Sequence, residues 1–328
     1  MCRTHHVALT LGALAVAIIR FAAAEPMLFS APVNLSEINS DVMDRDPCLS
    51  ADGLEIFFVS ARPGGVSDWD IWRATRSDTD SPFGSPENVS ELNSPGADGR
   101  PYLSRDGLTI YFHRAFWPDP ARGHDLYCAT RPDRFSPFSE PLPITELNTT
   151  YGEASPCISP DGLTIYFARK VSNDFHEDLY FATRLAPSDP FGPGVRIDEL
   201  STSFYDRDPR VSSDGLAMYF ASNRDGTHEG DFDIFLSERA SLSAPFGAPC
   251  RLVGVNTVEN DSSPFFDEGR DLLYFHSNGL AGAHGGNQAV DIWVSRVVPE
   301  PSSVVLMLSG FGAVVARRLR RRPKRGPH

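Results

Sequence analysis

Residues 156–167 read PCISPDGLTIYF, and this twelve-residue pattern decides the fold because it returns in four other parts of the chain. Each copy opens on a proline, and eleven residues later it reaches a phenylalanine. The prolines are Pro47, Pro101, Pro156, Pro209 and Pro264, and the phenylalanines are Phe58, Phe112, Phe167, Phe220 and Phe275. A spacing of 53 to 55 residues between copies indicates a repeat architecture, in which neighbouring units share one continuous core.

Each unit contains four short runs of β-forming residues separated by turn residues. In four of the five units an Asp-Gly pair follows the opening proline, where it supplies the positive φ of a tight hairpin. The apolar runs, such as Ile165-Tyr166-Phe167, are continuous, whereas a sheet with one wet face would alternate. Continuous runs are expected of sheets covered on both faces, as in the stacked blades of a propeller.

The two ends of the repeat region indicate a closed ring. Residues 29–39 match the fourth run of a unit, Phe83 to Asn93, with the same ten-residue spacing. No first three runs precede this stretch, and the last unit has three runs and no fourth. We therefore predict an all-β, five-bladed β-propeller whose N-terminal strand completes the last blade. An open solenoid would have dissimilar caps at its ends.

The repeats resemble a known family. Ser159-Pro160-Asp161-Gly162, an apolar strand, and then Asp178-Leu179-Tyr180 are similar to the WD40-like repeats of TolB-type propellers, and the resemblance covers about residues 29–296. It implies a β-propeller. TolB itself has six blades and a separate N-terminal domain, so its binding role is not carried over.

The N-terminus has the features of a secretory signal peptide. Residues 1–24 combine Arg3, an apolar stretch over 7–19 and the small residues Ala22-Ala23-Ala24. A retained membrane anchor is the alternative, because Arg20 interrupts the apolar region. The expected organisation is a signal peptide over 1–24, a propeller over 25–297 and a C-terminal tail over 298–328.

The tail consists of Pro299-Glu300-Pro301, an uncharged stretch over 304–316 and a cluster of arginines. Thirteen helical residues span about 20 Å, less than the roughly 30 Å hydrocarbon core, so we expect a short helix that inserts transiently. The order of parts resembles the PEP-CTERM sorting signal of Gram-negative bacteria. That resemblance implies an exosortase-type partner and delivery to the cell surface or extracellular matrix. A plain C-terminal membrane anchor is the alternative.

Charge is unevenly distributed along the chain. The nine cations within residues 1–24 and 317–328 leave 21 cations against all 43 acids in the stretch from Glu25 to Pro301, a net charge of −22. Proteins bind nucleic acid and anionic lipid through clustered cations. The negative charge of the body therefore argues against nucleic acid as a partner.

Only the loop between the second and third runs varies in length, which is typical of a scaffold that displays a binding face on one rim. On this variable rim, an acid stands three positions before each proline: Asp44, Asp98, Glu153, Asp206 and Asp261. Asp46 and Asp208 are additional acids in two repeats. Strict repetition favours five structural carboxylates that cap turns or pair with arginines. A Ca²⁺ site and catalysis are the alternatives, and no cofactor is required.

Histidines and cysteines point to no catalytic site. His124, His176, His228 and His284 fall in the variable loops at unequal offsets, so we expect exposed polar residues and no shared metal geometry. Cys48, Cys128, Cys157 and Cys250 are expected to be buried thiols with no obligatory bridge.

Three functions remain open. The first is a non-catalytic module that binds an envelope protein or exopolysaccharide, with Trp69, Phe116, Trp117, Phe175 and Phe232 available to stack on sugars. The second is a glycan hydrolase with Glu153 as the acid and Asp44 or Asp206 as base or nucleophile. The third is a structural spacer of the matrix.

Overall fold

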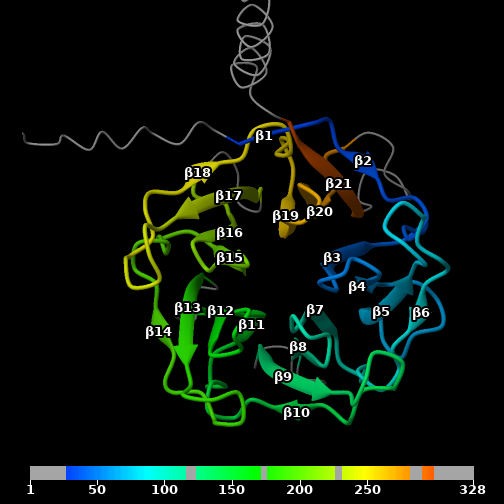
Figure 1. Cartoon of the computed structure of the whole chain (residues 1–328), viewed down its shortest axis with the longest axis horizontal. Helices are drawn as coiled ribbons and strands as arrows, with labels where there is room; N and C mark the ends of the chain where they lie inside the picture. Colours follow the sequence, from blue (N-terminus) through cyan, green and yellow to red (C-terminus); the bar gives the residue numbers. More distant parts are fainter. Residues whose placement is uncertain (1–26, 116–122, 171–175, 226–230, 281–289, 299–328) are drawn as a thin grey trace, which may run out of the picture.

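The structure is a computed structural model that describes residues 27–115, 123–170, 176–225, 231–280 and 290–298. Five antiparallel sheets stand around a central axis, with one edge strand of each sheet innermost (Figure 1). The prediction of an all-β, five-bladed propeller is confirmed. The signal peptide and almost all of the sorting tail lie outside the described residues.

Blades 1 to 4 each have three full strands and one short outer strand. Blade 1 is formed by β3 (Asp44–Leu49), β4 (Glu55–Ser60), β5 (Asp70–Thr75) and β6 (Glu87–Asn88). Blade 2 is formed by β7 (Asp98–Leu103), β8 (Thr109–Ala115), β9 (His124–Thr130) and β10 (Leu142–Pro143). Blade 3 is formed by β11 (Glu153–Ile158), β12 (Thr164–Lys170), β13 (Glu177–Thr183) and β14 (Val195–Arg196). Blade 4 is formed by β15 (Asp206–Val211), β16 (Ala217–Ser222), β17 (Asp233–Glu238) and β18 (Cys250–Arg251).

Blade 5 is assembled from both ends of the body, as predicted. Its inner strands are β19 (Asp261–Asp267), β20 (Leu272–Ser277) and β21 (Asp291–Val298). Two N-terminal strands, β1 (Leu28–Phe29) and β2 (Val33–Asn34), pair antiparallel with β21. Figure 1 shows both blue strands lying along the brown β21. The N-terminal segment therefore covers the last sheet edge and closes the ring.

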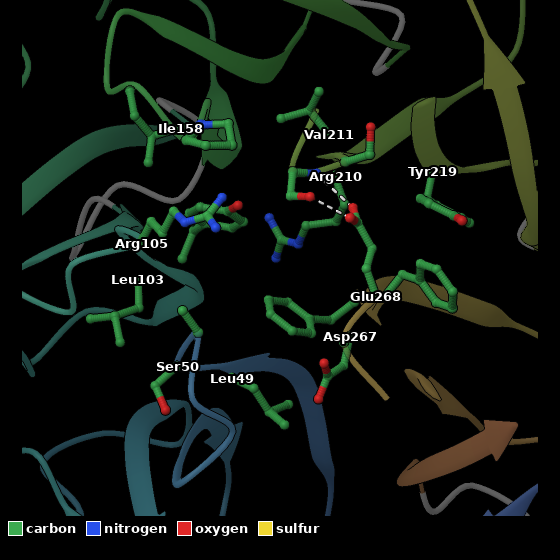
Figure 2. Close-up of a pocket in the computed structure, with 18 residues that line it drawn as sticks. Leu49, Ser50, Leu103, Arg105, Ile158, Arg210, Val211, Tyr219, Asp267 and Glu268 are labelled. Atoms are coloured by element: carbon green, nitrogen blue, oxygen red, sulfur yellow. Dashed lines mark hydrogen bonds between the residues drawn. The ribbon is translucent and has the colours of Figure 1, made fainter. Parts of the chain in front are cut away.

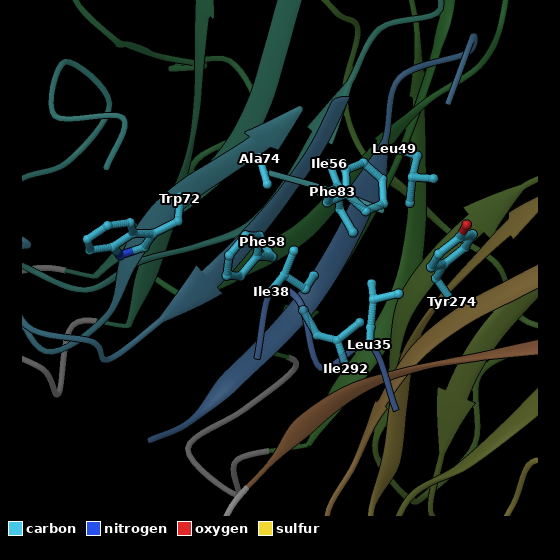
Figure 3. Close-up of a cluster of buried hydrophobic side chains, with 10 residues drawn as sticks. All are labelled: Leu35, Ile38, Leu49, Ile56, Phe58, Trp72, Ala74, Phe83, Tyr274 and Ile292. Carbon is cyan, nitrogen blue, oxygen red and sulfur yellow. The ribbon is translucent and has the colours of Figure 1, made fainter. Parts of the chain in front are cut away.

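The core lies between blades, where the phenylalanines of the repeat are fully buried. Figure 3 shows one such cluster, in which Phe58 and Trp72 of blade 1 meet Ile292 and Tyr274 of blade 5, with Leu35 packed beside them. Four more clusters of this kind surround the channel. Each sheet is thus covered on both faces, which accounts for the continuous apolar runs.

Every innermost strand is interrupted at its proline. The pairing register shifts beside each proline, and the residue before it has a positive φ: Asp46 (57°), Arg100 (50°), Ser155 (55°), Asp208 (56°) and Ser263 (51°). Proline has no N–H to donate to the ladder, so a bulge is where a strand tolerates it. We call these five residues the pre-proline ring, because their side chains meet in the central channel.

The cysteines are free thiols, and their burial differs from the prediction. Cys48 and Cys157 are buried beside the channel, Cys128 is half-buried, and Cys250 is exposed on the outer strand β18. The prediction of four buried thiols is therefore wrong for Cys250, because the short outer strand leaves side chains open to solvent. Among the described residues, no helix has the length and apolar character needed to cross a membrane.

Phe29 lies in the segment that closes the ring. Its side chain is 7% exposed and packs in the core cluster of blade 5. We expect Phe29→Ala to lower the free energy of unfolding by about 3 kcal/mol, measured by urea denaturation, because a buried ring is lost. Val33→Ala, in the same closing segment but at a 63% exposed position, should change it by less than about 0.5 kcal/mol. Equal losses in the two variants would contradict a role of Phe29 in holding the ring closed.

Candidate functional site

The five repeated acids of the variable rim are fully buried at the starts of the innermost strands. In blades 1 to 4 each carboxylate forms an ion pair with an arginine: Asp44–Arg62 (2.6 Å), Asp98–Arg114 (2.6 Å), Glu153–Arg169 (2.8 Å) and Asp206–Arg224 (2.6 Å). A serine or threonine four residues earlier donates its backbone N–H and hydroxyl to the same carboxylate. Each acid thus holds the connection that leads into its own blade.

These contacts leave the repeated acids little capacity for a shared ligand. The arginines that hold them also stack over aromatic rings of the core, as Arg169 does over Phe167 at 5.1 Å. Among the described residues, no group of three or more His, Cys, Asp and Glu side chains is arranged to hold a metal ion. The Ca²⁺ interpretation of this rim therefore gains no support from the geometry.

Asp261 in blade 5 departs from the pattern. Gly279 stands where blades 1 and 4 have their arginines, and a Cβ there would lie 2.2 Å from Thr257 Oγ1. Without an arginine, burial raises the pKa of Asp261 to about 6. Burial also raises the pKa of Glu153, although Thr149 and Arg169 oppose the shift. Of the repeated acids, Asp261 is the one whose charge the fold stabilises least.

The pre-proline ring brings different residue types together in the channel. Ser263 donates its hydroxyl to Asp46 at 2.6 Å and also lies 3.1 Å from Asp208. Ser155 donates to Asp208 at 2.7 Å, and Arg100 Nε lies 3.0 Å from the same carboxylate. One serine hydroxyl therefore links the two aspartates, and residues from all five blades meet in one layer.

Further charged side chains surround this layer. Arg45 and Arg207 lie 3.3 Å from Asp46 and 3.6 Å from Asp208, and Glu177 lies 3.9 Å from Arg100. Burial opposes ionisation of the two aspartates, yet the neighbouring arginines outweigh it and the pKa of both carboxyls is lowered. Both aspartates are therefore anionic at neutral pH.

Three histidines border the ring in their neutral form. Burial lowers the pKa of His276 to about 4 and that of His124 to about 3, and it also lowers the pKa of His113. His124 packs against His113 with ring centroids 4.4 Å apart, so it is not the freely exposed loop residue expected from the sequence. His176 contacts Tyr205, whereas His228 and His284 lie outside the described residues.

Several buried polar atoms around the ring lack hydrogen bonds. Within the described part of the chain, these atoms are Arg45 Nε, Asp46 Oδ2, Arg100 Nε, His113 Nδ1, Glu177 Oε2 and Arg207 Nε. The ion pairs here bring charges close without the alignment of a hydrogen bond. Buried donors and acceptors are normally satisfied, so this layer is suited to hold water or polar groups of a ligand.

The aromatic residues expected to stack on sugars are differently placed. Phe232 is buried, with the Arg207 guanidinium 3.5 Å from its ring centre, so the prediction that it is exposed is wrong. Trp69 is half-buried beneath Arg45 at 3.7 Å. Phe116, Trp117 and Phe175 lie outside the described residues. Arginine side chains thus cover the two described rings.

Sequence reasoning identified Asp46 and Asp208 only as additional acids and missed Arg100, Ser155 and Ser263. A usable signal was present, because the position before each proline changes type from repeat to repeat, whereas the proline and the acid three positions before it do not. That variation marks a place where the fivefold pattern is broken.

Comparisons with known proteins support the sorting tail and the fold. The PEP-CTERM protein-sorting motif matches residues 297–322, which implies export, processing by exosortase-type machinery and association with the membrane or cell surface. No sequence among the curated proteins matches the chain.

Several solved structures are similar to this propeller at low identity. An α-L-arabinofuranosidase of family 62 from Coprinopsis cinerea is 13% identical, with a TM-score of 0.55 over 83% of this chain and 98% of that one. A family 117 glycoside hydrolase from Zobellia galactanivorans is 13% identical, with a TM-score of 0.55 over 84% and 93%. A putative TolB from Agrobacterium tumefaciens is 16% identical, with a TM-score of 0.48 over 78% and 77%.

The raised pKa of Asp261 makes a prediction about stability and pH. Because the folded-state pKa lies above the unfolded value, the stabilisation is present at low pH and is lost as pH rises through about 6. Asp261→Asn removes the ionisable group and therefore this loss. As the pH rises from 4 to 7, the free energy of unfolding of the variant should increase on the order of 2 kcal/mol relative to that of the wild type.

The matched control is Asp44→Asn, which leaves Arg62 without its buried partner. We expect Asp44→Asn to lower the free energy of unfolding by about 3 kcal/mol at pH 7, measured by urea denaturation. An Asp261→Asn variant that is less stable than the wild type at pH 7 would refute the assignment.

Proposed function

We propose that this protein is an exported propeller of a Gram-negative-type cell surface or extracellular matrix, where it acts as a non-catalytic binding module for a polysaccharide or an envelope protein. The signal peptide over 1–24 directs export, and exosortase-type processing of the tail over 298–328 places the body outside the cell. The variable rim faces the ligand, which enters the channel toward the pre-proline ring.

One observation carries the proposal: among the described residues, buried donors and acceptors around the pre-proline ring are close to opposite charges but form no hydrogen bonds. The charges of this polar layer are balanced, because Arg45, Arg100 and Arg207 face Asp46, Asp208 and Glu177. Hydroxyl groups both donate and accept hydrogen bonds, so a neutral polysaccharide suits such a layer better than an ionic ligand.

The protonation states support binding rather than hydrolysis. A glycosidase needs one protonated carboxyl beside the scissile oxygen and one ionised carboxylate. The pKa of both channel aspartates is lowered, so neither holds a proton at neutral pH. Glu153 has a raised pKa, but its oxygens accept bonds from Thr149 and Arg169, and it is fully buried.

Binding can be tested on a glycan array with the purified mature chain, accompanied by a pull-down from envelope proteins. Glu177→Gln keeps the side-chain shape and removes a charge from the layer, so we expect affinity for the captured glycan to fall about tenfold. Phe135→Ala, an 87% exposed residue of the loop between β9 and β10 on the opposite rim, should leave affinity unchanged. An empty array together with an empty pull-down would exclude the binding module and leave the structural spacer.

A glycan hydrolase is the second candidate, since glycoside hydrolases share this propeller fold. In a screen of polysaccharide substrates at pH 5 and pH 7, we expect no turnover from the wild type, because Asp46 and Asp208, the channel carboxyls among the described residues, both have a lowered pKa. Turnover abolished by Glu153→Gln but retained by Glu146→Gln, a change at an acid outside the repeated set, would establish the hydrolase instead. Turnover that Glu153→Gln leaves unchanged would remove Glu153 from the role of acid.

A further inference from the structure

The opposite end of the channel holds a second site. The hairpins that join the first and second strands surround a cavity of about 440 Å³, and all five blades contribute to its wall (Figure 2). Leu49, Leu103, Ile158, Val211 and Phe266, one from each blade, provide an apolar lining. This mouth lies across the ring from the variable rim, because the hairpins leave the far ends of the innermost strands.

Arg210 lies at the base of this cavity and is only 3% exposed. Figure 2 shows its side chain extending into the space between the surrounding residues. It follows Pro209, and its counterparts in the other blades are Cys48, Tyr102, Cys157 and Phe265, so it is the single cation of this layer. Among the described residues, no carboxylate forms an ion pair with it.

The hydrogen bonds of Arg210 are incomplete in a specific way. Its Nη1 donates to the carbonyl oxygen of Pro156 at 3.0 Å. Its Nε and Nη2 are buried and have no hydrogen-bond partner within the described part of the chain. These two nitrogens form one edge of the guanidinium plane, and their N–H groups point in parallel toward the same side. This edge is the fork that binds a carboxylate through two hydrogen bonds.

The surroundings of Arg210 do not neutralise its charge. Tyr102 lies with its ring centre 5.1 Å from the guanidinium carbon, which provides a cation–π contact and no negative charge. Burial raises the pKa of Cys48 to about 11 and also raises that of Cys157, so both neighbouring thiols are neutral. A buried cation without a counter-charge is costly, which favours an anionic ligand.

We propose that this cavity binds a small monocarboxylate with an apolar body, whose carboxylate accepts two hydrogen bonds from Arg210 Nε and Nη2. The site goes beyond the proposed function, because it lies at the opposite mouth from the polar layer. Its volume is in the lower part of the range of small-molecule pockets, about 300 to 1,000 Å³. The apolar wall contacts the body of the ligand.

The rim of the cavity restricts the charge of the ligand. Glu268 binds the backbone N–H and the hydroxyl of Ser213, and Asp267 pairs with Arg270 at 2.7 Å. These two carboxylates oppose a dianion such as phosphate. Arg105 is exposed at the same rim and adds a second positive charge for approach. Because Nε and Nη2 are buried, we expect side chains around Arg210 to shift when the ligand binds.

The test uses 3-phenylpropionate as the probe and its uncharged amide, 3-phenylpropionamide, as the matched ligand. By isothermal titration calorimetry on the mature chain, we expect the wild type to bind the carboxylate at least tenfold more tightly than the amide. Arg210→Lys keeps the charge but removes the fork, and Arg210→Met removes both at similar volume. Each should weaken carboxylate binding at least tenfold and leave amide binding unchanged.

Two controls distinguish binding at Arg210 from binding in the polar layer and from a loss of folding. Glu177→Gln, in the polar layer of the other mouth, should leave carboxylate binding unchanged, so a failure of the proposed function does not affect this result. Thermal unfolding without ligand should show Arg210→Met at least as stable as the wild type, since an unpaired buried charge is removed. Equal carboxylate affinity in the wild type and Arg210→Met, or loss of stability in Arg210→Met together with no binding by the wild type, would overturn the proposal.

Discussion

Each sheet of this protein has two apolar faces, and neither face can be left in water. This constraint governs the rest of the structure, because a blade is stable only when a blade stands on each side of it. The five buried phenylalanines of the second strands lie at these contacts. The last sheet edge is covered by β1 and β2 on β21, so the two ends of the body meet in one blade.

The residues that recur in every blade and those that differ between blades have separate roles in this ring. The acids that recur in every repeat are bound within their own blades, four of them by arginines, and they maintain the connections between blades. The residues before the prolines differ from blade to blade, and they meet in the channel as the pre-proline ring. Arg210 is a second interruption, since no other blade has a charge at its position. Candidate sites therefore occur where the symmetry of the repeat is broken.

The sequence predicted the fold well because its signals were local and repeated. A proline and a buried phenylalanine at constant spacing specify each blade, with an Asp-Gly turn between them in four of the five, and the unpaired fourth run at residues 29–39 predicted closure. The site was predicted less well. The regular spacing of five acids made them the candidate rim residues: Asp44, Asp98, Glu153, Asp206 and Asp261. The sequence did not indicate Arg100, Ser155, Ser263 and Arg210, because they follow no motif. Phe232 was expected to be exposed and is covered by Arg207, a contact between residues 25 positions apart in the chain.

By itself, the sequence determined the number of blades, the strand that closes the ring and the sorting motif at the C-terminus, because each depends on the order of residues along the chain. Only the tertiary structure decided which side chains face the channel, since the bulge before each proline turns one residue inward. It also decided which charges are compensated. Asp208 accepts a hydrogen bond from Ser155 and forms an ion pair with Arg100, both of other blades, whereas the fork of Arg210 has no hydrogen-bond acceptor among the described residues. Such pairings join residues 50 or more positions apart and exist only once the blades have packed around the channel.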